Sequence, residues 1–192
     1  MRIISGTARG TKLYTLEGID TRPTLDRIKE ALFSIIQSKI TDSVVLDLFA
    51  GSGALGIESL SRGASFSYFC DNSAKACNII NQNIEKTHLK DKSLLYNTTY
   101  KNCLKKLKEN NINFDIIFLD PPYESDLIYL SIKEIIDLKI LKEDGIIIAE
   151  TDNEQEIINE LKKLQISIYN IKRYGRVKLL FLKQFKSSEG MV

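Results

Sequence analysis

The chain has 192 residues, of which 43% are hydrophobic and 27% are charged, and its formal net charge is +2. This is the composition of an ordinary globular protein, and the length allows one domain with a substantial core. Its apolar runs are far shorter than the roughly 20 residues that cross a bilayer. The first residues lack the apolar core of a secretory signal. We therefore expect a cytoplasmic protein with no membrane contact.

Cysteine and histidine usage does not suggest a metal centre. Cys70, Cys77 and Cys103 lie in apolar or helical patterns, and their spacing differs from that of zinc motifs. The single histidine, His88, lies near the end of a helical pattern. We predict three buried free thiols and no bound metal.

The charge is unevenly distributed. Residues 1–39 carry seven basic and four acidic groups, and residues 162–192 carry eight basic groups and one acidic group. Because the whole chain has a net charge of only +2, the middle is acidic. Basic ends around an acidic centre fit a polyanionic partner held by the termini. Lysine-rich ends that only increase solubility are an equally good explanation of charge alone.

The predicted elements begin with a basic hairpin and a helix. Residues 2–6 and 10–15 have the pattern of two short strands around a glycine-bearing loop, and residues 25–36 place apolar side chains on one helical face. From residue 44 onward, strand patterns alternate with helical patterns. The strands are predicted at residues 44–50, 66–70, 94–96, 114–119, 145–150, 166–171 and 178–185. The helices between them are predicted at residues 54–62, 73–89, 101–109, 127–141 and 154–164.

This alternation defines the fold class. Near-continuous apolar strands separated by helices are typical of a parallel sheet that is covered on both faces. The last two strands have no helix between them, so they must pair antiparallel. We predict an α/β fold with a doubly wound, mostly parallel seven-stranded sheet and a reversed C-terminal edge strand. Residues 1–39 would form a small hairpin and helix extension, and residues 40–192 the main domain.

One strand ends in an unusual tetrapeptide. Residues 114–119 are apolar at nearly every position, and Asp120, Pro121, Pro122 and Tyr123 follow directly. Two prolines cannot continue a sheet, so the strand stops there and leaves a carboxylate, free carbonyls and an aromatic ring at its carboxyl end. These groups could hold a flat molecule that bears an amino group. A proline turn without a function is the alternative.

A second ligand-binding pattern follows the first predicted strand of the alternating region. Asp47 precedes a loop with Gly51 and Gly53, and Asp71 ends the next strand. Glycines let the backbone turn tightly and approach a ligand, and an acid at the position of Asp71 can bond ribose hydroxyls.

An NAD site has similar features, but the charge of Asp47 would oppose a pyrophosphate and attract an ammonium group. No hydride-transfer set accompanies the loop. S-adenosylmethionine therefore fits better than NAD. The alternative is that both glycines serve packing only.

Together these motifs resemble the class I S-adenosylmethionine-dependent amino-methyltransferases that act on nucleobases. Residues 22–27 (RPTLDR), 46–64 (LDLFAGSGALGIESLSRGA), 114–123 (FDIIFLDPPY) and 173–175 (RYG) narrow the resemblance to the bacterial 16S ribosomal RNA guanine-N2 methyltransferase family, RsmD. The resemblance covers nearly the whole chain. The central tetrapeptide is typical of the whole class, whereas residues 22–27 make the assignment narrow.

The resemblance implies a methyl transfer from S-adenosylmethionine to N2 of a guanine, with roles for three groups of residues. The catalytic group comprises Asp120, Pro121, Pro122 and Tyr123. The cofactor-binding group comprises Asp47, Phe49, Ala50, Gly51, Ser52, Gly53, Asp71, Asn72 and Thr99, with Arg22 and Thr24. The RNA-binding group comprises Arg2, Arg9, Lys12, Arg22 and Arg27. The implied partner is 16S ribosomal RNA, within the small ribosomal subunit or its precursor.

The sequence departs from the family pattern in one place. The family usually has an acid after the third strand, where it contacts the adenine amine of the cofactor. Here residues 97–100 read NTTY, and Thr99 is the best match to that position. Backbone groups would then have to recognise the adenine.

Three other functions remain open from sequence. The same tetrapeptide serves methyltransferases that act on DNA adenine or on protein glutamine, although the chain has no separate DNA-recognition domain. A non-catalytic RNA-binding assembly factor could keep the fold and bind the cofactor without methyl transfer. An NAD oxidoreductase is the third alternative.

Overall fold

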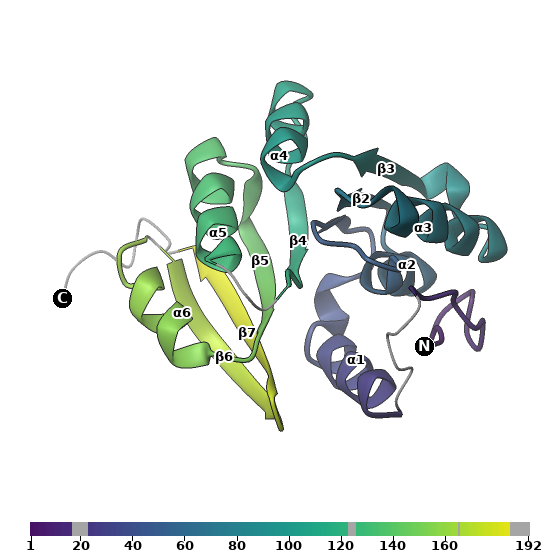
Figure 1. Cartoon of the computed structure of the whole chain (residues 1–192), viewed down its shortest axis with the longest axis horizontal. Helices are drawn as coiled ribbons and strands as arrows, with labels where there is room; N and C mark the ends of the chain where they lie inside the picture. Colours follow the sequence, from purple (N-terminus) through teal and green to yellow (C-terminus); the bar gives the residue numbers. More distant parts are fainter. Residues whose placement is uncertain (17–22, 123–125, 165, 185–192) are drawn as a thin grey trace.

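The computed structural model describes residues 1–16, 23–122, 126–164 and 166–184, with the backbone alone for residues 23–25. In this part of the chain, seven strands form one sheet in the order β3-β2-β1-β4-β5-β7-β6 (Figure 1). The strands are β1 (Val44–Asp47), β2 (Phe66–Asp71), β3 (Ser93–Asn97), β4 (Phe114–Leu119), β5 (Leu141–Thr151), β6 (Ile166–Tyr174) and β7 (Val177–Gln184).

The sheet confirms the predicted fold class. Strands β1 to β5 pair in parallel, whereas β7 pairs antiparallel with both β5 and β6. The C-terminal strand β7 is therefore the reversed one, and it lies between β5 and the edge strand β6. Strand order changes direction between β1 and β4, which is where ligands bind in such sheets.

Helices cover both faces of the sheet because alternate strand residues point in opposite directions. Ile116 and Phe118 of β4 pack on the face of the first three helices, whereas Ile117 and Leu119 pack on the face of the last three. The helices are α1 (Pro23–Ile35), α2 (Ala54–Ser61), α3 (Ala74–Lys86), α4 (Tyr100–Glu109), α5 (Leu127–Leu138) and α6 (Glu154–Leu161). Within the described ranges, no helix is long and apolar enough to cross a membrane. The three cysteines are buried and free, as predicted.

Several element boundaries differ from the sequence prediction by three or four residues. Strand β1 ends at Asp47 rather than residue 50, although the Leu48 and Ala50 amides still donate to carbonyls of β4 and β2, Phe118 (3.2 Å) and Cys70 (3.0 Å). Helix α5 ends three residues early and β5 begins four residues early. The reason is that Lys139 adopts a left-handed φ of 53°, which stops the helix.

The N-terminal hairpin is short and packs against the main domain. Its single β-bridge joins Arg2 and Lys12, and Ile3 exchanges backbone hydrogen bonds with Thr11 and Gly10. Ile3 and Leu13 are buried in the same hydrophobic cluster as α1, α2 and one face of the sheet. The division of the chain at residue 39 stays a prediction.

Gly6 brings the hairpin against the end of α2. The amide of Thr7 donates to the Ser61 carbonyl at 2.8 Å, and a Cβ on Gly6 would lie 1.7 Å from that carbonyl oxygen. Gly6 and Gly10 have nearly the same φ, +85° and +84°, but a Cβ on Gly10 would meet nothing within 4 Å. A comparison of alanine substitutions at the two positions therefore distinguishes the cost of a positive φ, which both share, from the cost of a steric clash, which only position 6 has.

We expect Gly6→Ala to destabilise the protein more than Gly10→Ala. Both substitutions place alanine at positive φ, which costs about 1–2 kcal/mol. Only alanine at position 6 also forces the hairpin away from α2, which adds about 1–3 kcal/mol by comparison with overpacked cores. Urea unfolding of both variants measures the difference. Equal losses would show that the hairpin does not rest on Ser61 in solution.

Candidate active site

A cavity of about 720 Å³ opens at the carboxyl ends of the central strands, where the strand order changes direction. It brings together both motifs singled out from sequence. The predicted site residues that line it are Asp47, Phe49, Ala50, Gly51, Ser52, Asp71, Asn72, Thr99, Asp120, Pro121 and Pro122. Gly53 is not among the lining residues. Arg22 and Tyr123 lie outside the described residues, as does the side chain of Thr24.

The two glycines of the loop have different structural roles. Gly51 has a φ of +55°, and a Cβ there would meet no atom within 4 Å, so its open side faces the cavity. Gly53 has a φ of +76° and precedes α2, and a Cβ there would lie 3.3–3.4 Å from Ile57, Ile80 and Phe69. Gly51 therefore fits close approach of a ligand, whereas Gly53 serves the turn and the packing of α2.

Two carboxylates hold the glycine turn in place. Asp47 Oδ2 accepts a hydrogen bond from the Gly56 amide at 3.0 Å, and Asp71 Oδ2 accepts one from the Gly51 amide at 2.9 Å. The second oxygen of Asp71 accepts from the Ser73 amide at 2.8 Å. Both side chains also line the cavity. They orient the loop and place negative charge on the cavity wall.

Burial makes Asp47 unusually basic. The side chain is 2% exposed, and this desolvation raises the pKa of Asp47 to about 7, with a further increase from the negative charge of Asp71. The hydrogen bond from the Gly56 amide opposes the shift. A cationic group in the cavity would favour the ionised carboxylate, so the site is suited to an ammonium ion.

We expect the affinity for S-adenosylmethionine to rise with pH below about 7. Because the pKa of Asp47 in the free protein is about 7, binding of an ammonium group at lower pH must first displace a proton. Isothermal titration from pH 5.5 to 7.5 measures the effect, which Asp47→Asn should remove. A pH-independent affinity would contradict the role of Asp47 in binding the ammonium group.

The same raised pKa of Asp47 means that the free protein loses stability as pH increases from about 4 to 7.

Asp120 lines the same cavity and directly follows β4, the strand paired with β1. Its side chain is open to the cavity, while Pro121 beside it is buried. Desolvation by the surrounding walls raises the pKa of Asp120 well above its usual value, and the charges of Glu150 and Asp47 raise it further. When ionised, Asp120 is therefore more basic than an ordinary aspartate and a stronger hydrogen-bond acceptor.

Several lining residues were not predicted. Glu150 lies next to the last residue of β5, which pairs with β4, so the reasoning that located Asp120 at the end of its strand could also have found it. Tyr100 packs against Phe49 with ring centroids 5.8 Å apart and ring planes tilted by 43°, and both line the cavity. Lys29 also lines the cavity. Its sequence pattern did not indicate this, because it resembles that of a solvated lysine on a helix. Thr99, in contrast, was predicted, and besides lining the cavity it accepts a hydrogen bond from the Asn102 amide as the N-cap of α4.

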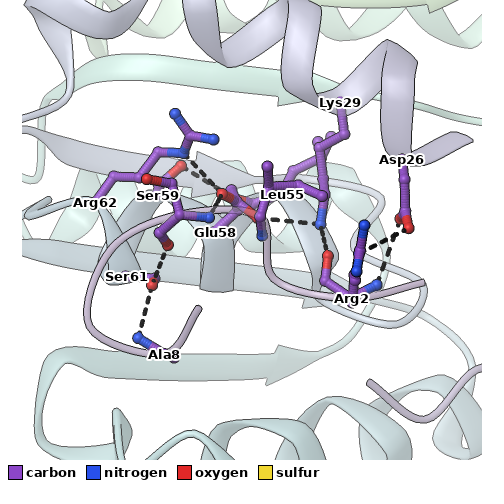
Figure 2. Close-up of polar contacts among 12 residues, drawn as sticks. Arg2, Ala8, Asp26, Lys29, Leu55, Glu58, Ser59, Ser61 and Arg62 are labelled. Atoms are coloured by element: carbon purple, nitrogen blue, oxygen red, sulfur yellow. Dashed lines mark hydrogen bonds and ion pairs between the residues drawn. The ribbon is translucent and has the colours of Figure 1, made fainter. Parts of the chain in front are cut away.

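A buried ionic network joins the N-terminal hairpin to α2. Glu58 is fully buried and accepts hydrogen bonds from the amides of Ile4 (2.8 Å) and Ser5 (3.0 Å). Its carboxylate also pairs with Lys29 Nζ at 3.1 Å and Arg62 Nε at 2.7 Å (Figure 2). Burial lowers the pKa of Lys29, although the charge of Glu58 opposes this shift. The network fixes the hairpin and α1 against the helix that follows the glycine turn.

The predicted RNA-binding side chains in the described part of the chain are exposed. Arg9, Lys12 and Arg27 are open to solvent, and Arg2 is exposed but lies 3.6 Å from Asp26 in an ion pair (Figure 2). Three of the four project from the docked hairpin. Among the described residues, no group of three or more histidine, cysteine or acidic side chains could hold a metal ion.

The cavity fits an amino-acid nucleoside such as S-adenosylmethionine. The buried carboxylate of Asp47 and the half-buried carboxylate of Asp71 face it at the ends of β1 and β2. The backbone of Gly51 is open to it, and apolar and aromatic side chains form much of its remaining wall. These are the groups that an ammonium, a ribose and a flat base require. Among the described residues that line the cavity just after β3, none is acidic, so no acid there is available to contact the adenine amine.

The sheet order and the position of the cavity define a class I methyltransferase fold. A ribosomal protein L11 methylase from Lactobacillus delbrueckii subsp. bulgaricus shares the fold with a TM-score of 0.67 at 22% identity, over 80% of this chain and 76% of that one. The solved structure of yhhF from Escherichia coli is more similar. Its TM-score is 0.81 at 29% identity, over 96% of this chain and 97% of that one.

The family model described as Conserved hypothetical protein 95 matches residues 1–183, and the chain belongs to this family. Curated relatives named "Ribosomal RNA small subunit methyltransferase D" occur in Haemophilus influenzae, with 37% identity over 82% of both chains, and in Escherichia coli K12, with 32% identity over 80% of this chain and 76% of the relative. The resemblance to RsmD that was inferred from the motifs is confirmed.

Proposed function

We propose that the protein transfers a methyl group from S-adenosylmethionine to the exocyclic N2 of a guanine in 16S ribosomal RNA, in the cytoplasm. The proposal rests mainly on one observation: the glycine loop with Gly51 and the Asp120-Pro121 turn line the same cavity. The glycine loop fits a methyl donor, and the Asp120-Pro121 turn fits an amine. Family membership and the names of the curated relatives support ribosomal RNA as the substrate.

The cofactor, when bound, supplies an electrophilic methyl group on a sulfonium. Asp47 would hold the ammonium of its amino-acid part, the backbone of Gly51 would lie against that part, and Asp71 would bond the ribose hydroxyls. Phe49 and Tyr100 would flank the adenine, with backbone groups near Thr99 in place of an acid. These roles use the charges and openings that line the cavity.

Asp120 and the Pro121 carbonyl would orient the guanine amine. The lone pair of this amine is delocalised into the ring, which makes it a poor nucleophile. Two acceptors for its two hydrogens would favour tetrahedral geometry and direct the lone pair into the cavity. Such alignment and electrostatic positioning can supply much of a rate enhancement. Tyr123, outside the described residues, would stack on the base, which must be unpaired or flipped out to enter.

The hairpin would hold the RNA around the target base. Arg2, Arg9 and Lys12 are exposed on it, and Arg27 is exposed on the adjoining α1. Contacts of basic side chains with phosphates set the position of an RNA without reading its sequence. Because Glu58 fixes the hairpin to α2, these charges keep a constant position relative to the glycine turn.

Mapping of methylated bases in 16S ribosomal RNA tests the proposal. We expect one N2-methylguanine to disappear in cells that lack the gene and to return when the gene is restored. Incubation of the purified protein with small subunits or with protein-free 16S RNA from the deletion strain then identifies the substrate, and we expect assembled subunits or their precursors to be methylated faster. Identical methylation maps with and without the gene would overturn the proposal.

A further inference from the structure

An exposed aromatic residue lies beside the cavity without a role in the function proposed above. The side chain of Tyr14 is 50% exposed, and Lys86 Nζ of α3 lies 4.2 Å from the centroid of its ring. Lys86 is itself exposed. Lys86 therefore lies over one face of a half-exposed ring in a cation–π contact. Exposed aromatic rings stack single-stranded bases, and neighbouring cations hold phosphates of the same strand.

The backbone of Tyr14 is held more firmly than an exposed residue requires. The buried side chain of Asn83 accepts a hydrogen bond from the Tyr14 amide at 2.7 Å and donates one to the Tyr14 carbonyl at 2.9 Å. Asn83 Nδ2 also donates to the Ser52 carbonyl at 2.9 Å. All three bonds use one buried amide, so the position of Tyr14 is tied directly to the glycine turn.

Tyr14 also lies next to the cavity wall. Thr15, the following residue, lines the cavity, and so does Ser52 at the other end of the Asn83 bridge. On its other side, the chain leads back to Lys12 and Arg9 in the basic hairpin. Along the chain, Tyr14 therefore lies between the residues expected to hold phosphates and a residue that lines the cavity expected to take the target guanine.

We propose that Tyr14 and Lys86 form a stacking site for an unpaired nucleotide of the RNA, close to the nucleotide that enters the cavity. The inference rests on the proposed function, because it assigns this surface to the same RNA substrate. The ring contacts a base through its face, and Lys86 contacts a phosphate. Asn83 holds this site at a fixed position relative to the cofactor loop. Stacking is tolerant of base identity, so the site contributes affinity and position rather than sequence specificity.

Three variants test the stacking site: Tyr14→Ala, Tyr14→Phe and, as a matched control, Tyr169→Ala. Tyr169 is another exposed tyrosine, 42% exposed on β6 at the edge of the sheet. Binding of small-subunit RNA and of S-adenosylhomocysteine is measured for each. We expect Tyr14→Ala to weaken RNA binding about 5- to 150-fold, the range of a lost base–aromatic stack. Tyr14→Phe should keep near-normal RNA binding, and Tyr169→Ala should change neither affinity.

Salt dependence separates the ring from the cation. Lys86→Gln should reduce the slope of log affinity against log salt concentration by about 0.7, as for one phosphate contact on single-stranded nucleic acid. Tyr14→Ala should leave that slope unchanged. A salt slope in Lys86→Gln equal to that of the wild type would remove Lys86 from the site.

Other outcomes overturn the stacking site as a whole. They are RNA binding of Tyr14→Ala within twofold of wild type, a loss in Tyr14→Phe as large as in Tyr14→Ala, or an equal loss in Tyr169→Ala. A parallel loss of S-adenosylhomocysteine binding in Tyr14→Ala would place the ring in the cofactor site instead. Wild-type protein that neither binds nor methylates the RNA would overturn the proposed function itself.

Discussion

Replacement of Asp120 by alanine is expected to lower the rate of methyl transfer by about 10²–10³-fold, the usual cost of one lost group that stabilises developing charge. In the proposed mechanism, loss of the carboxylate would leave the guanine amine only the Pro121 carbonyl as an acceptor, and its lone pair would no longer be aligned. Binding of S-adenosylhomocysteine should stay close to that of the wild type, since the cofactor groups lie around Gly51. Single-turnover methylation at saturating cofactor measures the chemical step.

Two further variants make the Asp120 result specific. Asp120→Asn keeps the size of the side chain and one acceptor oxygen, so we expect a smaller loss than with alanine. Asp137→Asn is the matched control, because Asp137 is an exposed carboxylate on α5 that pairs with Lys133. It should retain wild-type activity. Near-normal turnover by a folded Asp120→Ala protein would remove Asp120 from the proposed mechanism.

Glu58→Ala is expected to destabilise the protein by about 3–5 kcal/mol, the cost of removing one partner from a buried ion pair. The substitution leaves Lys29, which is 4% exposed, without its carboxylate and removes the acceptor of the Ile4 and Ser5 amides. Arg62 is more exposed and can turn to solvent. The free energy of unfolding is measured by urea denaturation. Because the hairpin depends on this network, its amides should also exchange with solvent faster.

An ion pair on the surface provides the comparison for Glu58. Glu85 pairs with Lys90 at 3.7 Å, and their side chains are 64% and 76% exposed. Exposed pairs contribute about 0–1 kcal/mol, so Glu85→Ala should have little effect. Glu58→Gln, which keeps the shape of the side chain but removes its charge, should lie between the two. Similar losses for Glu58→Ala and Glu85→Ala would mean that the buried network does not hold the hairpin.

The site could be located from sequence because of a general property of parallel sheets. The carboxyl ends of parallel strands lie at one edge, so the glycine loop after Asp47 and the acids Asp71 and Asp120 at the ends of two other strand patterns had to come close together. Glycine positions and the two prolines marked where the chain turns. None of this required knowledge of which helix packs on which face.

Residues that act through distant partners could not be located in this way. Glu58 meets Ile4 across 54 positions of the chain, and Asn83 meets Tyr14 across 69. In sequence, both look like ordinary polar residues of a helix. Their burial follows only from the way the hairpin lies on α2 and α3, which no local pattern encodes.

The order of residues alone therefore determined the alternation of strands and helices, the mostly parallel sheet and the edge at which the ligand motifs meet. It did so because side-chain periodicity and turn chemistry act over a few neighbouring residues. Tertiary structure alone decided that Gly51 faces the cavity while Gly53 packs inside, that Asp47 has a pKa near 7, and that a buried glutamate holds the basic hairpin. Burial and charge at these positions depend on atoms that only folding brings together.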